Sequence, residues 1–159
     1  MERQPQLLNM QWSLKPFSAL TTDELYAILQ LRSLVFVVEQ NCPYLDQDEK
    51  DQLSWHLLGS QANKLVAYTR ILPPGISYEM PSIGRVVTSP QVRRTGIGRL
   101  LMQKSIDSCH QLFGKEPIQI GAQQYLESFY TSLGFEISGS PYLEDGILHI
   151  HMILRSVGS

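Results

Sequence analysis

Two arginines and two glycines stand together directly after an apolar run, and this combination could bind an anion. Residues 93–98 read RRTGIG and follow the run at residues 83–87. Glycines let backbone N–H groups approach a ligand closely, and a helix that starts here adds unpaired N–H donors and a partial positive charge. The segment therefore predicts a cradle for a pyrophosphate.

Two other phosphate-binding patterns do not fit this segment. A Walker loop needs Lys-Ser or Lys-Thr after its second glycine, and neither dipeptide follows Gly98. A dinucleotide-binding fingerprint needs a third glycine, where this chain has Leu101. What remains is Arg-x-x-Gly-x-Gly between a strand and a helix, which resembles the signature loop of the GNAT family of acyl-CoA-dependent N-acetyltransferases.

Further segments extend this resemblance over nearly the whole chain. Residues 123–135 read QQYLESFYTSLGF and are similar to the family's Asn-(six residues)-Tyr-x-x-x-Gly-Phe helix, with Gln123 in place of the asparagine. Residues 35–44 and 142–152 resemble the ElaA-like branch of the family. The resemblance implies an α+β GNAT fold: one mixed, mostly antiparallel sheet of six to seven strands, about four flanking helices, and a parallel crossover pair splayed around the cofactor.

The resemblance also implies that acetyl-CoA is the cosubstrate. In family terms the backbone N–H groups of the cradle hold the CoA pyrophosphate, the arginines add charge-assisted hydrogen bonds, and the preceding strand pairs with the pantetheine arm. The residues assigned to cofactor binding in this way are Val86, Val87, Arg93, Arg94, Thr95, Gly96, Ile97, Gly98, Arg99, Gln123 and Phe129.

Tyr130 is the candidate general acid. Direct attack of an amine on the thioester, in a ternary complex without an acyl-enzyme, needs a proton for the departing thiolate. A tyrosine with an ordinary pKa of ~10 is protonated at neutral pH and can supply it. Helical spacing places Tyr130 at the edge of the apolar stripe of Leu126, Phe129 and Leu133. The alternative is a tyrosine that only completes the core.

The general base is less well marked. The acceptor amine arrives as an ammonium, so a group must take a proton from it directly or through water. Glu39 is the first choice because it follows the first helix, in a region that borders the acceptor side in GNAT proteins; the alternative is a solvated charge. The other available groups are His56, Glu79, His149 and His151.

Two charged or metal-binding patterns have competing interpretations. His149 and His151 share one face of a strand, where a surface or cleft-lining role is favoured over holding a metal because no third ligand is close in sequence. Four acidic residues in the irregular stretch 39–52 could attract a cationic acceptor, although a solvated loop is the favoured interpretation. These are Asp46, Asp48, Glu49 and Asp51.

Periodicity predicts the elements that position these residues. Alternation from Leu8 to Leu14 predicts a first strand, and Thr21 with Glu24 forms a capping box for a helix that runs towards Val35. Helices are expected at residues 97–113 and 126–133, each followed by a glycine. Further strands are expected at residues 55–58, 65–72, 83–88, 118–122, 135–139 and 148–154, with a right-handed parallel crossover through the helix at 97–113.

Composition bounds the class of protein. With 159 residues, 43% of them hydrophobic, the chain fits one globular domain, and the resemblance implies that residues 1–159 form a single GNAT acyltransferase domain. The net charge of −2 disfavours a nucleic-acid partner, no apolar run is long enough to span a membrane, and two cysteines show no metal spacing. We therefore expect a cytoplasmic monomer or homodimer, without a metal, that acetylates a small-molecule or peptide amine. The alternative is a CoA-binding regulatory or protein-interaction module with little catalysis.

Overall fold

A single eight-stranded sheet organises the chain in the computed structural model, which describes residues 9–155. The strand order is β1-β2-β3-β4-β5-β8-β6, and β7 also pairs with β8. Neighbours are antiparallel except β4 and β5, which are parallel as expected. The strands are β1 Met10–Pro16, β2 Trp55–Gln61, β3 Lys64–Leu72, β4 Ser82–Thr88, β5 Ile118–Gln123, β6 Glu136–Ile137, β7 Tyr142–Glu144 and β8 Ile147–Leu154.

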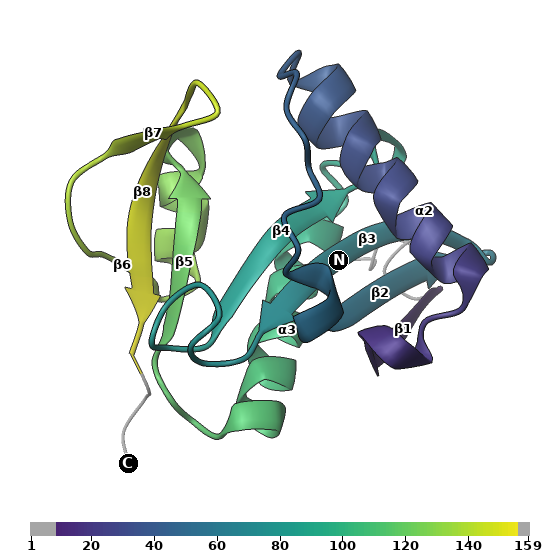
Figure 1. Cartoon of the computed structure of the whole chain (residues 1–159), viewed down its shortest axis with the longest axis horizontal. Helices are drawn as coiled ribbons and strands as arrows, with labels where there is room; N and C mark the ends of the chain where they lie inside the picture. Colours follow the sequence, from purple (N-terminus) through teal and green to yellow (C-terminus); the bar gives the residue numbers. More distant parts are fainter. Residues whose placement is uncertain (1–8, 156–159) are drawn as a thin grey trace, which may run out of the picture.

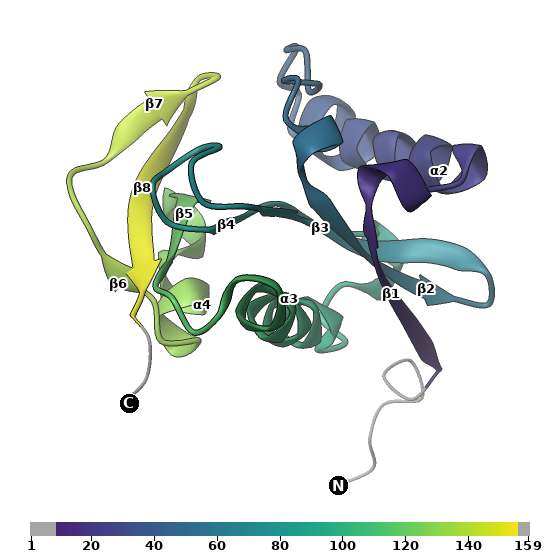
Figure 2. The same cartoon turned by 60° about the horizontal axis from the view of Figure 1, so that its bottom comes forward.

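Helices cover both faces of this sheet. Helix α2, Thr22–Arg32, lies on one face, and α3, Ile97–Phe113, with the short α4, Glu127–Ser132, lies on the other (Figure 2). A π-helical segment, Ser33–Glu39, continues α2. Among residues 9–155 there are three α-helices instead of the expected four or so. The 3₁₀ turns are Phe17–Ala19, Asp51–Leu53, Pro90–Val92 and Gln124–Leu126.

The strongest local signals of the sequence are confirmed. The Thr21 hydroxyl accepts from the Glu24 N–H, and the Glu24 carboxylate accepts from the Thr21 N–H, so the capping box is complete. Helix α3 has the predicted bounds, and Gly114 after it is left-handed, with φ 85°. Leu8 of the first predicted strand lies outside the described residues. The expected strand at residues 135–139 is only Glu136–Ile137, and β7 was not expected.

Two apolar clusters hold the layers together. Leu101 and Met102 of α3 are fully buried against the sheet with Met152 of β8. On the opposite face Ile28 of α2 packs with Tyr68 of β3, both fully buried. The two clusters hold the helices against the two faces of the sheet. No helix in the described part of the chain is long and apolar enough to cross a membrane.

The sheet parts in its middle, between β4 and β5. These strands share one register pair, Ser82 with Gln119, and then diverge, as Figure 1 shows. A β-bulge follows that pair: Tyr68 of β3 faces Val87, but Arg70 faces Gly84, so β4 carries an extra residue and Arg85 takes a left-handed φ of 50°. Because a bulge bends a strand and increases its twist, it turns β4 away from β5.

Candidate active site

A cleft of about 1090 Å³ lies where β4 and β5 diverge. Its walls come from segments far apart in the sequence, including the π-helical segment, β4 with the following loop, β5, α4 and the β7–β8 hairpin. The divergence exposes strand edges of both half-sheets to one space. The cleft therefore lies at the parallel crossover, next to the loop after β4 in which the sequence predicted a pyrophosphate site.

The predicted cradle sits at the start of α3. Gly96, with φ 90°, immediately precedes the helix, and Arg94 also has a positive φ of 63°. The Thr95 hydroxyl donates to the Val92 carbonyl at 2.5 Å and thereby closes the turn. A Cβ on Gly98 would meet no atom within 4 Å, so this position faces open space beside the first N–H groups of the helix. The local conformation fits an anion at the helix N-terminus.

The structure brings six of the predicted cofactor residues to the cleft wall: Val86, Val87, Arg93, Gly98, Gln123 and Phe129. The remaining five do not line the cleft. Ile97 is fully buried in the core, and the Arg99 guanidinium donates to the Ser132 hydroxyl at 2.6 Å, beside a separate, smaller pocket. Arg94, Thr95 and Gly96 complete the turn itself.

Tyr130 of α4 lines the same cleft while its ring packs in the core. The side chain is 5% exposed, and its ring meets those of Phe129 and Phe135 edge-on, at centroid distances of 5.2 and 5.9 Å. Burial raises the pKa of the Tyr130 hydroxyl, so the group stays protonated at neutral pH. Tyr130 therefore packs in the core and also borders the cleft, and its role as general acid stays a prediction.

Glu39 lies at the cleft beside the cradle. Its carboxylate is 2.5 Å from the Arg93 guanidinium. The residues after it reach across the divergence: the Gln40 and Gln123 side-chain amides pair at 3.3 Å, and the Cys42 thiol donates to the Asp145 carbonyl at 3.0 Å. Segment 39–42 thus joins the cradle, the end of β5 and the β7–β8 turn.

The other candidate bases differ in whether they line the cleft. His56 is fully buried; its Nδ1 accepts from the Tyr68 hydroxyl at 2.7 Å and its Nε2 donates to the Asp51 carbonyl at 2.9 Å. Burial lowers the His56 pKa, which agrees with a neutral ring. Glu79 is exposed and away from the cleft lining. His149 and His151 both line the cleft, as the sequence favoured.

Aromatic residues that the sequence did not single out surround the two histidines. We call Tyr78, Tyr142, His149 and His151 the β8 cluster. The Tyr142 ring stacks on His151 at 4.5 Å and on His149 at 5.7 Å, and Tyr78 meets His151 edge-on at 5.6 Å. Both tyrosine hydroxyls lie close to Gly121 of β5. Glu144 lies 3.5 Å from His149 Nε2.

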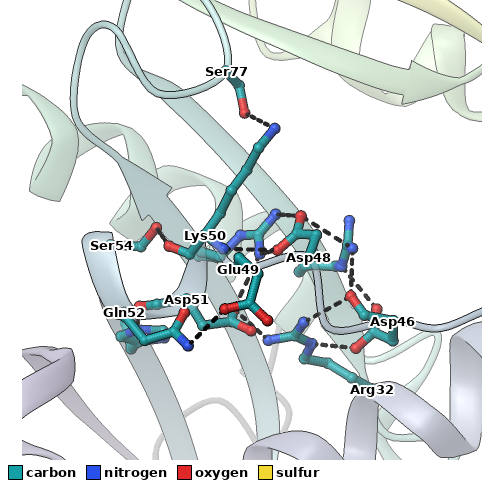
Figure 3. Close-up of polar contacts among 12 residues, drawn as sticks. Arg32, Asp46, Asp48, Glu49, Lys50, Asp51, Gln52, Ser54 and Ser77 are labelled. Carbon is teal, nitrogen blue, oxygen red and sulfur yellow. Dashed lines mark hydrogen bonds and ion pairs between the residues drawn. The ribbon is translucent and has the colours of Figure 1, made fainter.

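The acidic stretch is not a solvated loop, and this expectation was wrong. Its aspartates alternate with three arginines in a closed ring of ion pairs, part of which Figure 3 shows. Arg32, Asp46, Asp51 and Arg70 are each at most 6% exposed. The successive N–O distances are 2.8 Å for Arg85–Asp46, 2.6 Å for Asp46–Arg32, 2.7 Å for Arg32–Asp51, 3.0 Å for Asp51–Arg70, 2.7 Å for Arg70–Asp48 and 3.4 Å for Asp48–Arg85.

This ion-pair ring fixes residues 46–51 against α2, β3 and β4. Burial alone would raise the pKa of Asp48, but the hydrogen bonds and charge of Arg70, with the charge of Arg85, lower it to about 2. The three positive and three negative charges cancel, so the ring presents little net charge to an acceptor. No local sequence pattern predicts the ion-pair ring, because its three arginines come from three separate elements. Only its acidic residues lie close together in the sequence.

Comparisons with known proteins agree with this architecture. A family model described as an acetyltransferase (GNAT) domain matches residues 36–156. Protein ElaA of Escherichia coli strain K12 is 43% identical over 145 residues, which cover 90% of this chain and 95% of that protein.

Solved structures add to this likeness. The crystal structure of an acyl-CoA N-acyltransferase from Pseudomonas aeruginosa is 40% identical, with a TM-score of 0.86, and the match covers 91% of this chain and 98% of that one. A GNAT family acetyltransferase from Elizabethkingia anophelis, solved with acetyl-CoA bound, shares the fold at 16% identity and a TM-score of 0.64. The chain therefore belongs to the GNAT acetyltransferase family, in its ElaA-like branch, and is an acyltransferase.

Proposed function

We propose that this acyltransferase transfers an acetyl group from acetyl-CoA to a primary amine, by direct attack in a ternary complex. The observation that carries this proposal is the continuous cleft that has the glycine cradle at one side and the Tyr130 hydroxyl in its wall. Acetyl-CoA in the Elizabethkingia anophelis relative supports the choice of acyl donor.

In this proposal the first turn of α3 binds the pyrophosphate. The unpaired N–H groups and the positive end of the helix dipole act on the phosphates, and Arg93 adds charge. Arg93 now pairs with Glu39, so a phosphate would share or replace that partner. The edge of β4 at Val86 and Val87 offers backbone groups to the pantetheine amides, and Gln123 offers its side-chain amide.

Tyr130 then supplies the proton for the leaving thiolate. The protonated hydroxyl lies in a buried position, where a hydrogen bond to a developing thiolate is stronger than in water. Glu39 remains the sequence-based candidate for the base, and its carboxylate pairs with the Arg93 guanidinium.

The direct test measures release of free CoA from acetyl-CoA with a panel of diamines, polyamines, aminoglycosides, amino acids and peptide amines. We expect protection from thermal unfolding by acetyl-CoA, and turnover with at least one amine. Protection without turnover across the panel would instead favour a CoA-binding regulatory module. Absence of protection at millimolar acetyl-CoA would refute the cradle assignment itself.

A further inference from the structure

The β8 cluster lies where the two half-sheets separate. Gly121 of β5 is the ladder partner of His151 of β8, so both positions face the same side of the sheet. Gly121 is two residues beyond Gln119, whose pairing with Ser82 is the last between β4 and β5. The cluster therefore stands at the floor of the cleft, beside the point of divergence.

Gly121 lets the cluster come close to the strand backbone. A Cβ at this position would lie 2.6 Å from the Tyr142 hydroxyl oxygen and 3.0 Å from that of Tyr78. Any side chain here would displace both hydroxyls. The glycine thus brings two hydrogen-bonding oxygens over the centre of the cleft, although the phenol rings come from different segments, β7 and the loop before β4.

His151 has hydrogen-bonding capacity that no other residue uses. Its Nδ1 is buried and has no hydrogen-bond partner within residues 9–155. A buried polar nitrogen without a partner costs free energy. His110 Nε2 of α3 is also buried without a partner, but His110 does not line the cleft, whereas His151 does. The ring is held between Tyr142 and Tyr78, which fixes its orientation at the cleft.

The neighbours of His151 do not compete with it as proton acceptors. Burial raises the pKa of Tyr78 and of Tyr142, so both hydroxyls stay protonated at neutral pH. His149 on the same strand donates from Nδ1 to the Ile147 carbonyl at 2.8 Å, and its Nε2 faces Glu144. Glu144, the nearest charged side chain of β7, is directed at His149 and not at His151.

Charge in this part of the cleft suggests what enters it. Glu144 and Asp145 line the cleft, and neither pairs with a lysine or arginine in the part of the chain that the structure describes. The cationic side chains of the lining are engaged: Arg70 and Arg85 in the ion-pair ring, Arg93 with Glu39, and Lys50 with the Ser77 hydroxyl. Carboxylates and tyrosine faces together attract a cation.

Building on the proposed acetyl transfer, we propose that the β8 cluster is the acceptor site, that it takes a cationic primary amine with no carboxylate beside the reacting nitrogen, and that His151 is the base. The ammonium first gives one proton to His151 and becomes a nucleophile. Its nitrogen then bonds to the thioester carbonyl carbon as the carbon–sulfur bond breaks. The CoA sulfur takes the Tyr130 proton, the second proton of the nitrogen passes through water to the Tyr130 oxygen and restores its hydroxyl, and His151 releases its proton to solvent.

The experiment compares His151→Gln with the wild type, using the best amine of the panel. We expect kcat/KM to fall about 100-fold or more, the size of a general-base contribution, while acetyl-CoA still protects the variant from unfolding. The wild-type pH profile should show an ascending limb that reports deprotonation of the base, and the variant should lack it. An analogue of the amine with a lower pKa, which is already partly neutral, should lose less activity on substitution.

Two control variants test whether the effect is specific to His151. His110→Gln removes a histidine of α3 that is not in the cleft lining, and should leave the kinetics unchanged. Glu39→Gln tests the sequence-based candidate. If Glu39→Gln abolishes the ascending limb and His151→Gln keeps it, the proposal is overturned. A preference for α-amino acids over diamines would overturn the assigned acceptor class.

The failure of this proposal differs from failure of the proposed function. If the wild type releases no CoA with any amine, acetyl transfer to amines is refuted and the base assignment falls with it. If the wild type is active and His151→Gln equals it across pH 5 to 8, only the assignment to His151 is refuted. Histidine NMR signals give a second readout: addition of the amine should shift those of His151 and leave those of His110.

Discussion

At the scale of single residues, Tyr130 belongs both to the core and to the lining of the cleft. Its ring fills space between Phe129 and Phe135, while the hydroxyl belongs to the cleft wall. A phenylalanine keeps the ring contacts and removes only the oxygen. Substitution here can therefore separate the stability of the fold from the reaction.

We expect Tyr130→Phe to lower kcat about 100-fold or more and to leave acetyl-CoA binding intact, because only the proton donor is lost. Steady-state release of CoA and a titration with acetyl-CoA measure the two effects. Unchanged kcat in a variant that binds normally would show that water or another group protonates the thiolate.

A second prediction at this scale concerns Gly98 in the first turn of α3. Gly98→Ala should raise the free energy of unfolding by up to ~1 kcal/mol, because alanine is the better helix former and its Cβ meets no atom within 4 Å. The same methyl group projects into the cleft, so the variant should bind acetyl-CoA more weakly. Urea unfolding should show the gain in stability, and a titration with acetyl-CoA should show the loss in affinity.

Gly96→Ala is the matched comparison for Gly98→Ala. Gly96 has φ 90°, a conformation that costs any other residue on the order of 1 kcal/mol, so this variant should lose stability as well as affinity. Equal binding by Gly98→Ala and the wild type would place the pyrophosphate elsewhere.

At the scale of elements, the ion-pair ring joins the loop before β2 to one helix and two strands. Each charged group in it has two neighbours of opposite sign. Residues 46–51 have little apolar side chain to bury, so these pairs take the place of a hydrophobic contact. The loop in turn places Asp48 and Tyr44 in the cleft wall.

Removal of one member should therefore be costly. We expect Asp46→Asn to lower the free energy of unfolding by about 3–5 kcal/mol, because it leaves the fully buried Arg32 with a weaker partner. Arg155→Gln, which breaks an exposed 3.6 Å pair with Glu136, should cost about 1 kcal/mol or less. Urea denaturation of both variants at pH 7 gives the comparison; equal effects would contradict a structural role of the ring.

At the scale of the whole molecule, the buried His56 and the half-buried Asp48 predict how stability depends on pH. The folded-state pKa of His56 is lowered, so its contribution is complete above ~6.5, the pKa in the unfolded chain, and is lost as the pH falls below it. Asp48, with a folded pKa of about 2, contributes fully above ~3.9 and loses this between there and about 2. We expect the urea midpoint to fall from pH 7 to pH 5 and to fall again below pH 4.

His56→Gln isolates the first of these steps. The variant will be less stable overall, because it changes a buried group with two hydrogen bonds. Its midpoint should nevertheless change less between pH 7 and pH 5 than that of the wild type. A slope equal to the wild type's would assign the step to another group.

The sequence predicted what local rules determine. Both ends of helix α3 were predicted correctly because its apolar spacing and Gly114 are local signals, and residues 93–98 alone predicted a glycine turn directly before that helix. The ion-pair ring could not be predicted, because Arg32, Arg70 and Arg85 meet the aspartates only through the tertiary fold. Strand β7 was missed because its three residues are too short for a recognisable alternation. The contact of Tyr142, in this strand, with His151 was therefore missed as well.

The divergence of β4 and β5 has a consequence for how the protein behaves in concentrated solution. An ordinary open sheet has unpaired edges only at its rims, but this sheet also has two inside it, beyond the pair of Ser82 and Gln119. Free strand edges are templates for self-association. A CoA molecule bound between these two edges would cover them. Preparations saturated with acetyl-CoA should therefore aggregate less, and scatter less light on storage, than the same protein without it.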